Sequence, residues 1–311
     1  MLSRVAERIY WVARYIERTE NTARLVNVYS DLMLDLPDGV GLQWRQLIDI
    51  SGAANFSKRY RSAGERNVLR FMLCDRDNPN SVLSCLAAAR ENVRTTRDLV
   101  PSEGWENVNE LYLFGRKKFG AKNLPKGLYE VLSQVVGRCQ QITGLLAGTM
   151  SHGDAYRFLR IGRHLERADM TTRIVDVGSA TLIASGAEIL RLENRLWMNV
   201  LRALSAYQMY RQHVRRRIKG TDAIAFLLQD TQFPRAVAHS LAEIQDSLQT
   251  LPRNDATLRA VGRARRLVNS DVRALSGEHL HRFIDDLQAE IGAVHTQVES
   301  TWFAPELDEA V

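Results

Sequence analysis

The chain has 311 residues, of which 45% are apolar and 25% are charged, proportions typical of a globular protein and unlike those of a disordered chain. Its net charge of +6 comes from 36 arginines and six lysines against 36 acidic residues, without the strong basic stripe expected of a nucleic-acid-binding protein. No stretch approaches the roughly 20 apolar residues of a membrane span. The N-terminal residues are too highly charged for a signal peptide, and three scattered cysteines favour a reducing compartment. We therefore expect a cytoplasmic protein that binds neither nucleic acid nor membranes.

Apolar residues recur at intervals of three and four along almost the whole chain, which is the pattern of amphipathic α-helices. The first long helix is expected to end near Pro37, and Asn78-Pro79 predicts the start of a later one. Strand-like alternation is absent. The pattern predicts an all-α multi-helix bundle of roughly eleven or twelve helices. Three of its apolar stripes comprise Val5, Ile9, Val12, Ile16 and Ala23, then Val82, Leu83, Leu86 and Val93, then Leu128, Val131, Leu132, Val135 and Val136.

Two parts of the chain resemble each other. RYIERTENTARLV (14–26) and RHLERADMTTRIV (163–175) belong to a 22-residue alignment at an offset of 149, in which eight positions are identical. A second block, FMLCDRDNPNSVLSCL (71–86), aligns with FLLQDTQFPRAVAHSL (226–241) at an offset of 155, and Trp44 aligns with Trp197 between the two blocks. Collinear matches with a slowly drifting offset predict two internally duplicated, pseudo-symmetric halves, 1–150 and 151–311, packed as one compact unit.

Charged residues form one stripe along each repeated helix when the segment is drawn on a helical wheel. Three interpretations remain open: a solvated face with weak exposed ion pairs, a buried ion network that fixes how the two halves dock, and a ligand-binding or catalytic site. Tyr10 and Trp11 beside the stripe argue against a solvated face, as does the presence of four charged residues in both copies. The stripes comprise Arg14, Glu17, Arg18, Asn21 and Arg24, and then Arg163, Glu166, Arg167 and Arg173, with Met170 in place of Asn21.

A third arginine-rich stripe lies in ARENVRTTRD. Arg90, Arg94 and Arg97 are spaced by four and three residues, and Glu91 falls beside them on the same helix. This stripe is either a surface or packing network or part of an anion site. The second copy has no such run, so an anion site is expected to be asymmetric and centred on the first half. The equivalents at the offset of 155 are Gln245, Asp246 and Gln249.

Several segments, taken together and in order, resemble the alpha-E family, which is named for an all-helical fold and an ER motif. They are RYIERTENTARL, HLERADMTTRI, DRDNPNSVLSCLAAARENVRTTRDLVPSEGWENVNEL and DTQFPRAVAHSL. The resemblance runs from Met1 to about residue 300. The family's motif residues correspond to Arg14, Glu17, Arg18, Glu20 and Asn21, to Asp75, Pro79 and Ser81, to Arg90, Glu91, Asn92, Arg94 and Arg97, and to Arg163, Glu166, Arg167 and Asp169.

The resemblance implies a bacterial protein whose gene lies beside, or is fused to, that of a circularly permuted ATP-grasp, amidoligase-like protein. A transglutaminase-like cysteine peptidase is a frequent neighbour of the family and a further expected partner. This context implies a part in peptide synthesis, tagging or modification. The chain itself has no Walker loop and no GxGxxG motif, so we expect no cofactor in this chain, with ATP and Mg²⁺ held by the ATP-grasp partner.

Two hypotheses from different functional classes are therefore carried forward. In the first, the chain is a non-catalytic helical partner subunit that binds the ligase or an anionic or peptidic substrate through its Arg/Glu stripes. In the second, it is a transferase or ligase-type enzyme in which Glu17 or Glu166 acts as acid/base on an acyl-phosphate or carboxylate substrate. The expected substrate-binding residues are Arg14, Arg18, Asn21, Arg24, Arg90, Glu91, Arg94, Arg97, Arg163, Arg167, Arg173 and Asp75.

A metal centre is not expected. Glu278 and His281 form one ExxH motif, as in di-iron helical bundles, but such bundles need two of these motifs and two further glutamates. The histidines and cysteines show no spacing typical of nucleophilic catalysis.

Overall fold

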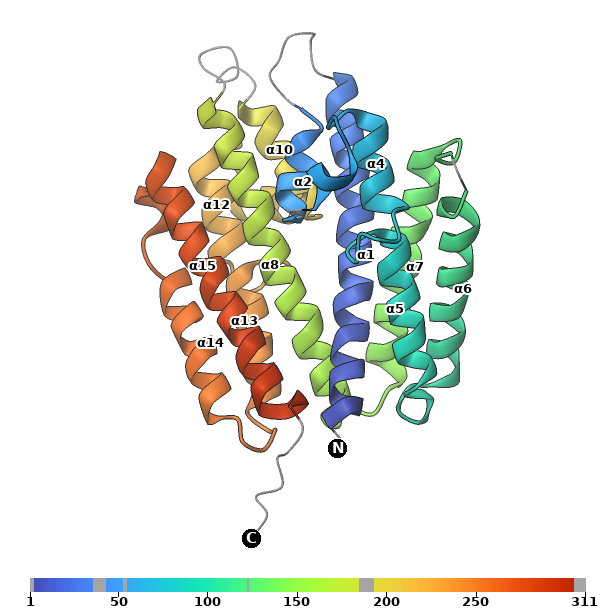
Figure 1. The fold of residues 1–311 in the computed structure, drawn as a ribbon. Helices are drawn as coiled ribbons and strands as arrows, with labels where there is room; N and C mark the ends of the chain where they lie inside the picture. Colours follow the sequence, from blue (N-terminus) through green and yellow to red (C-terminus); the bar gives the residue numbers. More distant parts are fainter. Residues whose placement is uncertain (1–2, 36–42, 53–54, 122, 185–192, 305–311) are drawn as a thin grey trace.

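The computed structural model describes residues 3–35, 43–52, 55–121, 123–184 and 193–304, which form an all-α bundle without strands (Figure 1). The predicted fold class is confirmed. These residues contain more α-helices than predicted, because α2, α3 and α11 have only seven, four and eight residues and are too short to show a clear period. The fourteen α-helices are α1 (Ser3–Asp35), α2 (Arg45–Ser51), α3 (Phe56–Arg59), α4 (Glu65–Leu73), α5 (Val82–Arg94), α6 (Ser102–Phe119), α7 (Leu128–Thr149), α8 (Asp154–Ala184), α10 (Glu193–Ala203), α11 (Tyr207–Val214), α12 (Gly220–Gln229), α13 (Val237–Leu248), α14 (Asp255–Val268) and α15 (Gly277–Val298).

The two longest helices, α1 and α8, form the centre of the bundle. They lie side by side and run in the same direction, and their mutual contact is the most extensive between any two described elements (Figure 1). Gly162 allows this close approach, because a Cβ atom at this position would lie only 2.4 Å from the carbonyl oxygen of Tyr10. The charged stripes predicted from the sequence lie on these two helices and therefore meet at the centre of the molecule.

The helices that flank the central pair follow the same order on both sides. On one side α1 packs against α5 and α7, with α6 outside them, and on the other α8 packs against α13 and α15, with α14 outside them (Figure 1). The loop between α7 and α8 spans residues 150–153, which is where the sequence places the boundary between the halves. The common origin of the halves and their division into 1–150 and 151–311 stay predictions from the sequence.

One helix start differs from the prediction. The cap of α5 is Ser81, whose Oγ accepts a hydrogen bond from the backbone N–H of Ser84 at 3.2 Å. Asn78 does not cap a helix that starts at Pro79. Its Oδ1 instead accepts a hydrogen bond from the backbone N–H of Asn80 at 3.1 Å, which makes a turn before the helix.

Two further predictions concern the end of the first long helix and the absence of membrane spans. The first helix ends at Asp35, and Pro37 lies outside the described residues. None of the described helices combines the length and the apolar character that crossing a bilayer requires.

Candidate binding site between the two central helices

Glu166 of α8 is bound by two arginines of α1. Arg14 Nε donates to Glu166 Oε2 at 2.6 Å, while Arg18 donates through Nε to Oε1 at 2.6 Å and through a terminal nitrogen to Oε2 at 2.9 Å. Glu166 is only 1% exposed. Because its two oxygens accept three charge-assisted hydrogen bonds, the carboxylate is saturated by the opposite half of the molecule.

Glu17 of α1 is bound by arginines from residues 151–311, so here the glutamate lies on α1 and the arginines lie on the other side. Arg235, two residues before α13, donates to Glu17 Oε1 at 2.7 Å and to Asn21 Oδ1 at 2.7 Å. Arg167 Nε lies 3.0 Å from the same Glu17 oxygen, close enough for an ion pair but not aligned for a hydrogen bond. Glu17 and Glu166 are thus related reciprocally: each glutamate is held by arginines of the other half.

Glu20 extends this cluster toward α7. Arg235 donates to Glu20 Oε1 at 2.6 Å, Gln140 donates to it at 3.2 Å, and Arg24 forms an ion pair with it. Arg163 lies close enough to Glu17 and Glu20 for electrostatic attraction. We call the nine charged side chains the Arg–Glu network; they are Arg14, Glu17, Arg18, Glu20, Arg24, Arg163, Glu166, Arg167 and Arg235.

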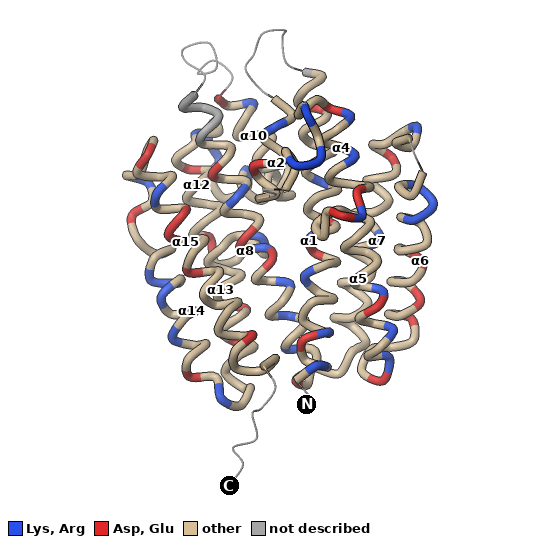
Figure 2. The backbone as a smooth tube through the Cα atoms, in the orientation of Figure 1, with Lys and Arg blue, Asp and Glu red and all other residues tan. Residues whose placement is uncertain are grey.

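Burial of the Arg–Glu network rules out a solvated face. Glu17, Glu20 and Glu166 are each 1% exposed, and basic and acidic positions meet halfway along α8 beside α1 (Figure 2). The contacts across the two halves favour the docking-network interpretation, in which buried ion pairs set the register of α1 against α8. Replacing Glu166, for example, would leave the buried charges of Arg14 and Arg18 without their counter-ion.

The charge environment keeps the two ER glutamates ionised. Burial alone would raise the pKa of Glu17, but Arg167 and Arg235 outweigh it and lower the pKa to about 2. Burial would likewise raise the pKa of Glu166, but Arg18 and Arg14 outweigh it and lower that pKa to about 2. A carboxylate with such a pKa is a weak general base and holds no proton to donate near neutral pH. The geometry therefore does not favour acid/base roles for these residues.

The lowered pKa values predict acid sensitivity. The folded pKa of Glu166 is about 2 against 4.5 for the free group, so its contribution to stability is complete above pH 4.5 and is lost as the pH falls toward 2. Buried His164, whose pKa burial lowers well below 6.5, adds a loss that begins at higher pH. Urea unfolding at pH 7, 5 and 3 should therefore show a smaller loss below pH 4.5 in Glu166→Gln than in wild type. Equal losses in both proteins would contradict this assignment.

Two members of the site were missed from the sequence. Arg235 aligns with Asn80 at the offset of 155, so the repeat could have pointed to it, but its reach to Glu17 and Glu20 depends on the tertiary fold. Tyr10 accepts a hydrogen bond from Arg14 at 2.9 Å, and its hydroxyl forms a second hydrogen bond with His295 Nδ1 of α15 at 2.8 Å. Burial and the charge of Arg14 lower the pKa of His295 to about 4, so the ring is neutral near pH 7.

A polar pocket with a volume of about 90 Å³ adjoins the network where α1, α8, α2 and the loop before α5 meet. Arg18 and Glu166 of the network form part of its wall, and Asp169 and Arg173 of α8 face them as an ion pair at 3.0 Å. Arg18 also donates to Asn80 Oδ1 at 2.5 Å, which fixes the asparagine at the wall. We call this cavity the Arg18–Arg173 pocket. Its remaining lining residues are Thr22, Ser51, Met72, Asn78 and Met170.

The predicted residues outside the central helices are not brought to this pocket. Asp75 pairs with Arg59 at 2.9 Å in the loop before α5. Arg90 donates to Asn109 at 2.7 Å, with its guanidinium over the rings of Trp105 and Tyr112.

The rest of the third stripe lies on the surface. Glu91 and Arg94 form an exposed ion pair at 2.7 Å, and the Arg97 guanidinium lies 4.0 Å from the centre of the Trp105 ring. The stripe is therefore a surface and packing network among the described residues. A substrate-binding role for its members stays a prediction.

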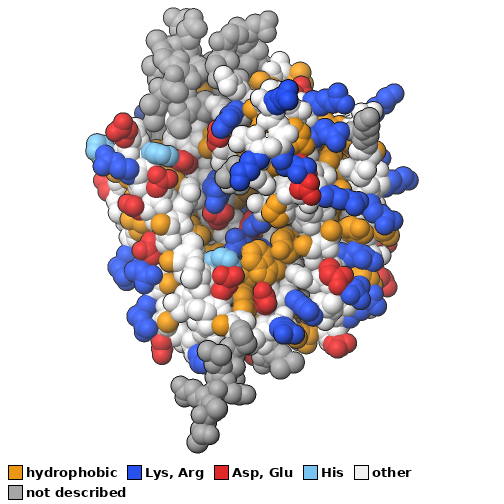
Figure 3. Space-filling model, in the orientation of Figure 1, with side chains coloured by type: hydrophobic (Ala, Val, Ile, Leu, Met, Phe, Trp, Pro, Cys, Tyr) orange, Lys and Arg blue, Asp and Glu red, His pale blue; other side chains and the backbone are white. Residues whose placement is uncertain are grey.

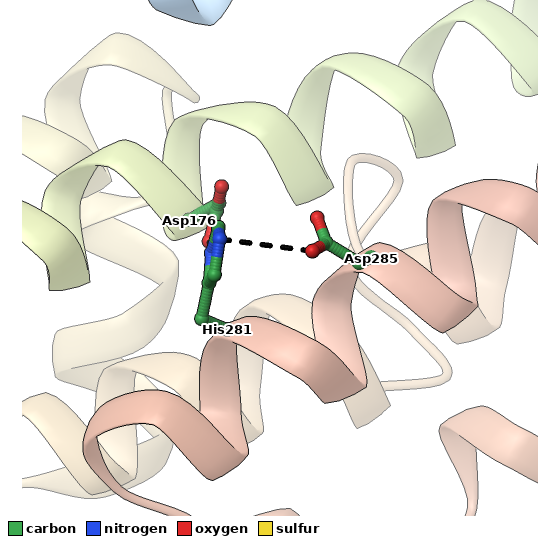
Figure 4. Close-up of side chains that lie close together, drawn as sticks. All are labelled: Asp176, His281 and Asp285. Carbon is green, nitrogen blue, oxygen red and sulfur yellow. Dashed lines mark hydrogen bonds and ion pairs between the residues drawn. The ribbon is translucent and has the colours of Figure 1, made fainter.

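A separate cluster joins α8 to α15 (Figure 4). His281 Nδ1 lies 2.6 Å from Asp176 Oδ1, and His281 Nε2 lies 3.6 Å from Asp285. One ligand atom from each residue falls within 4.8 Å of the others, and Glu278 of the ExxH motif is not part of the group. Because both ring nitrogens face carboxylates and His281 is largely exposed, the arrangement is that of a histidine–carboxylate contact between α8 and α15, which is an ion pair when the ring is protonated. The expectation that the chain holds no metal stays a prediction.

A family model described as a predicted alpha-helical domain with a conserved ER motif matches residues 1–303. The chain belongs to the Alpha-E family. The reciprocal arrangement gives the ER motif of this Alpha-E chain a physical role, since Glu17 and Glu166 each bind arginines of the other half.

Similar proteins include uncharacterized proteins of Mycobacterium bovis and of two Mycobacterium tuberculosis strains, each 21% identical over 275 residues. The match covers 82% of this chain and only 30% of each relative, so the Alpha-E chain spans less than a third of their length. No solved structure matches the chain.

Proposed function

We propose that this Alpha-E chain is a non-catalytic partner subunit of an ATP-grasp, amidoligase-like enzyme that acts in peptide synthesis, tagging or modification. The observation that carries the proposal is that the three glutamates of the Arg–Glu network are buried against arginines. Its glutamates are bound by arginines and stay ionised, so they hold the fold together and leave the chemistry to another protein.

The mycobacterial relatives support a function in combination with other domains. The matched region is 30% of each relative, so an Alpha-E-like region there is joined to a much longer remainder of the same chain. A domain that is covalently joined to others in one protein is a reasonable candidate for a separate subunit in another. In our proposal the ligase subunit supplies ATP, Mg²⁺ and the phosphate-binding loops, and the Alpha-E chain binds the ligase or its substrate.

The competing proposal is an enzyme that uses Glu17 or Glu166 as acid/base. A pKa of about 2 makes either group a poor proton acceptor near neutral pH. One oxygen of Glu17, Oε2, has no hydrogen-bond partner among the described residues, yet it is enclosed rather than placed at the Arg18–Arg173 pocket. The geometry therefore supports the partner subunit better.

The partner proposal is tested by mixing the purified chain with the circularly permuted ATP-grasp protein that the family resemblance leads us to expect in the neighbouring gene. We expect one complex on gel filtration and faster ATP-dependent product formation than with the ligase alone. An unrelated helical protein of similar size and charge is the control. Independent elution of the two proteins together with unchanged turnover would reject the proposal, and product formation by the Alpha-E chain alone would favour the enzymatic alternative.

A further inference from the structure

We propose that the Arg18–Arg173 pocket binds an oxyanion, either a carboxylate or a phosphate group. This oxyanion belongs to the ligand that the Alpha-E chain binds in its role as partner subunit of the ligase. The inference rests on the proposed function, because it names the chemistry of what the subunit would hold. It differs from the expectation of binding along the whole Arg/Glu stripes, since most of those arginines are already occupied by glutamates. Four observations carry it, and each concerns residues that the structure describes.

The first observation is an excess of positive charge at the centre of the molecule. The Arg–Glu network contains six arginines and three glutamates, an excess of three positive charges, and its side chains are at most 17% exposed where they form ion pairs. Arg163 is the extreme case. It is 9% exposed and forms no direct ion pair within the described part of the chain. Burying guanidinium groups without counter-ions is costly, so the surroundings of the pocket favour an anion over a cation, although Arg163 itself does not line the pocket.

The second observation is a surplus of hydrogen-bond donors at the pocket wall. Arg173 engages Asp169 through Nε, which leaves its two terminal nitrogens as donors. Asn80 accepts from Arg18 through Oδ1, so its amide nitrogen is a donor as well. Glu166 is saturated by Arg14 and Arg18, and Asp169 is paired with Arg173. A ligand that accepts hydrogen bonds suits this wall better than one that donates them.

The third observation concerns the short side chain beside Arg18. At the offset of 155, Asn80 aligns with Arg235, whose long side chain reaches Glu17 and Glu20. Asparagine is much shorter and leaves the volume of about 90 Å³ beside Arg18. This volume exceeds the roughly 10–15 Å³ that one water needs on the same measure, so a small anionic group fits.

The same comparison argues against a cationic ligand. Glu166 already has two guanidinium groups, from Arg14 and Arg18, just as Glu17 has two from Arg167 and Arg235. A further cation at the pocket would enlarge the excess of positive charge in the network.

The fourth observation is the basic surface beside the pocket. Ser51, the last residue of α2, lines the pocket, and the exposed residues that follow it in the chain include Lys58, Arg61 and Arg66. Basic side chains gather in the upper right of the face shown in Figure 3, over α2 and α4. A positive surface next to a pocket raises the local concentration of anions and speeds their association.

The test is isothermal titration calorimetry of the full chain with inorganic phosphate, acetate and methylammonium. The ionic strength is kept constant, because salt screens the interactions between charges. We expect phosphate or acetate to bind, and the tighter of the two identifies the class of oxyanion. Arg173→Met should weaken that binding by about tenfold or more, the loss expected for one charge-assisted hydrogen bond. Arg160→Met is the matched control, because Arg160 also lies on α8 and pairs with acidic residues but does not line the pocket.

A second variant, Asn80→Leu, removes the amide donor and should also weaken anion binding while Arg173 stays in place. Absence of binding by both anions, equal binding in wild type and Arg173→Met, or tighter binding of methylammonium would each overturn the inference. Gel filtration with the ligase on the same samples separates the two proposals. A complex without anion binding overturns only the pocket, and anion binding without a complex overturns only the partner function.

Discussion

Glu166→Gln is expected to lower the free energy of unfolding by about 3–5 kcal/mol, the range for breaking a buried ion pair by removing one partner. The amide is nearly the same size, so the loss would come from charge and hydrogen bonding and not from a cavity. Arg14 and Arg18 would keep their positive charges in a buried site without the carboxylate that now accepts from both. Urea unfolding of the purified variant at pH 7 measures the change.

The matched control for this variant is Glu110→Gln. Glu110 lies on α6 and its carboxylate is 4.0 Å from Arg138, with both side chains well exposed. Exposed pairs contribute about 0–1 kcal/mol, so the same chemical change there should have little effect. If Glu166→Gln were as stable as the control but had lost a product-forming activity, the enzymatic alternative would replace the docking network.

Gly162→Ala is expected to lower the free energy of unfolding by about 1–3 kcal/mol, as overpacking a close contact does. The added methyl group would lie 2.4 Å from the carbonyl oxygen of Tyr10, so the backbones of α1 and α8 would have to separate. The same shift would disturb the Tyr10 hydroxyl, which accepts from Arg14 within the site. Thermal unfolding should show a lower midpoint than wild type.

Gly144→Ala, made in the wild-type chain, is expected to change the free energy of unfolding in the opposite direction. Gly144 lies inside α7, and a Cβ atom there would have nothing within 4 Å. Alanine favours the helix over glycine by about 0.5–1 kcal/mol, so this variant should be slightly stabilised. Stabilisation of both variants by the same amount would show that α1 and α8 do not need the close approach at Gly162.

Helical periodicity predicted the fold class because α1, α5 and α7 each bury one long apolar stripe. It also placed Glu17 and Arg18 on one face of α1, since that placement follows from helix geometry alone. Periodicity could not show that the face is buried. That outcome depends on α8, which lies more than a hundred residues away in sequence and presents the complementary charges.

The members of the site that come from irregular segments were the hardest to predict. Arg235 precedes α13, and Asn80 lies in a turn that Asn78 organises, so neither belongs to a periodic pattern. The ARENVRTTRD stripe shows the opposite failure. Its spacing resembles an anion site on one helix, but α5 ends at Arg94 and Arg97 lies in a separate 3-10 helix, Arg97–Leu99. Arg90 and Arg97 both lie over the ring of Trp105, which the local pattern could not reveal.

The coupling free energy between Arg18 and Glu166 tests the central claim, that reciprocal ion pairs of the ER motif hold the two central helices together. It is obtained from the unfolding free energies of wild type, Arg18→Met, Glu166→Gln and the double variant. We predict a coupling of about 0.5–3 kcal/mol, with the double variant more stable than the sum of the single losses implies. Purely additive losses, or single variants as stable as wild type, would contradict the claim.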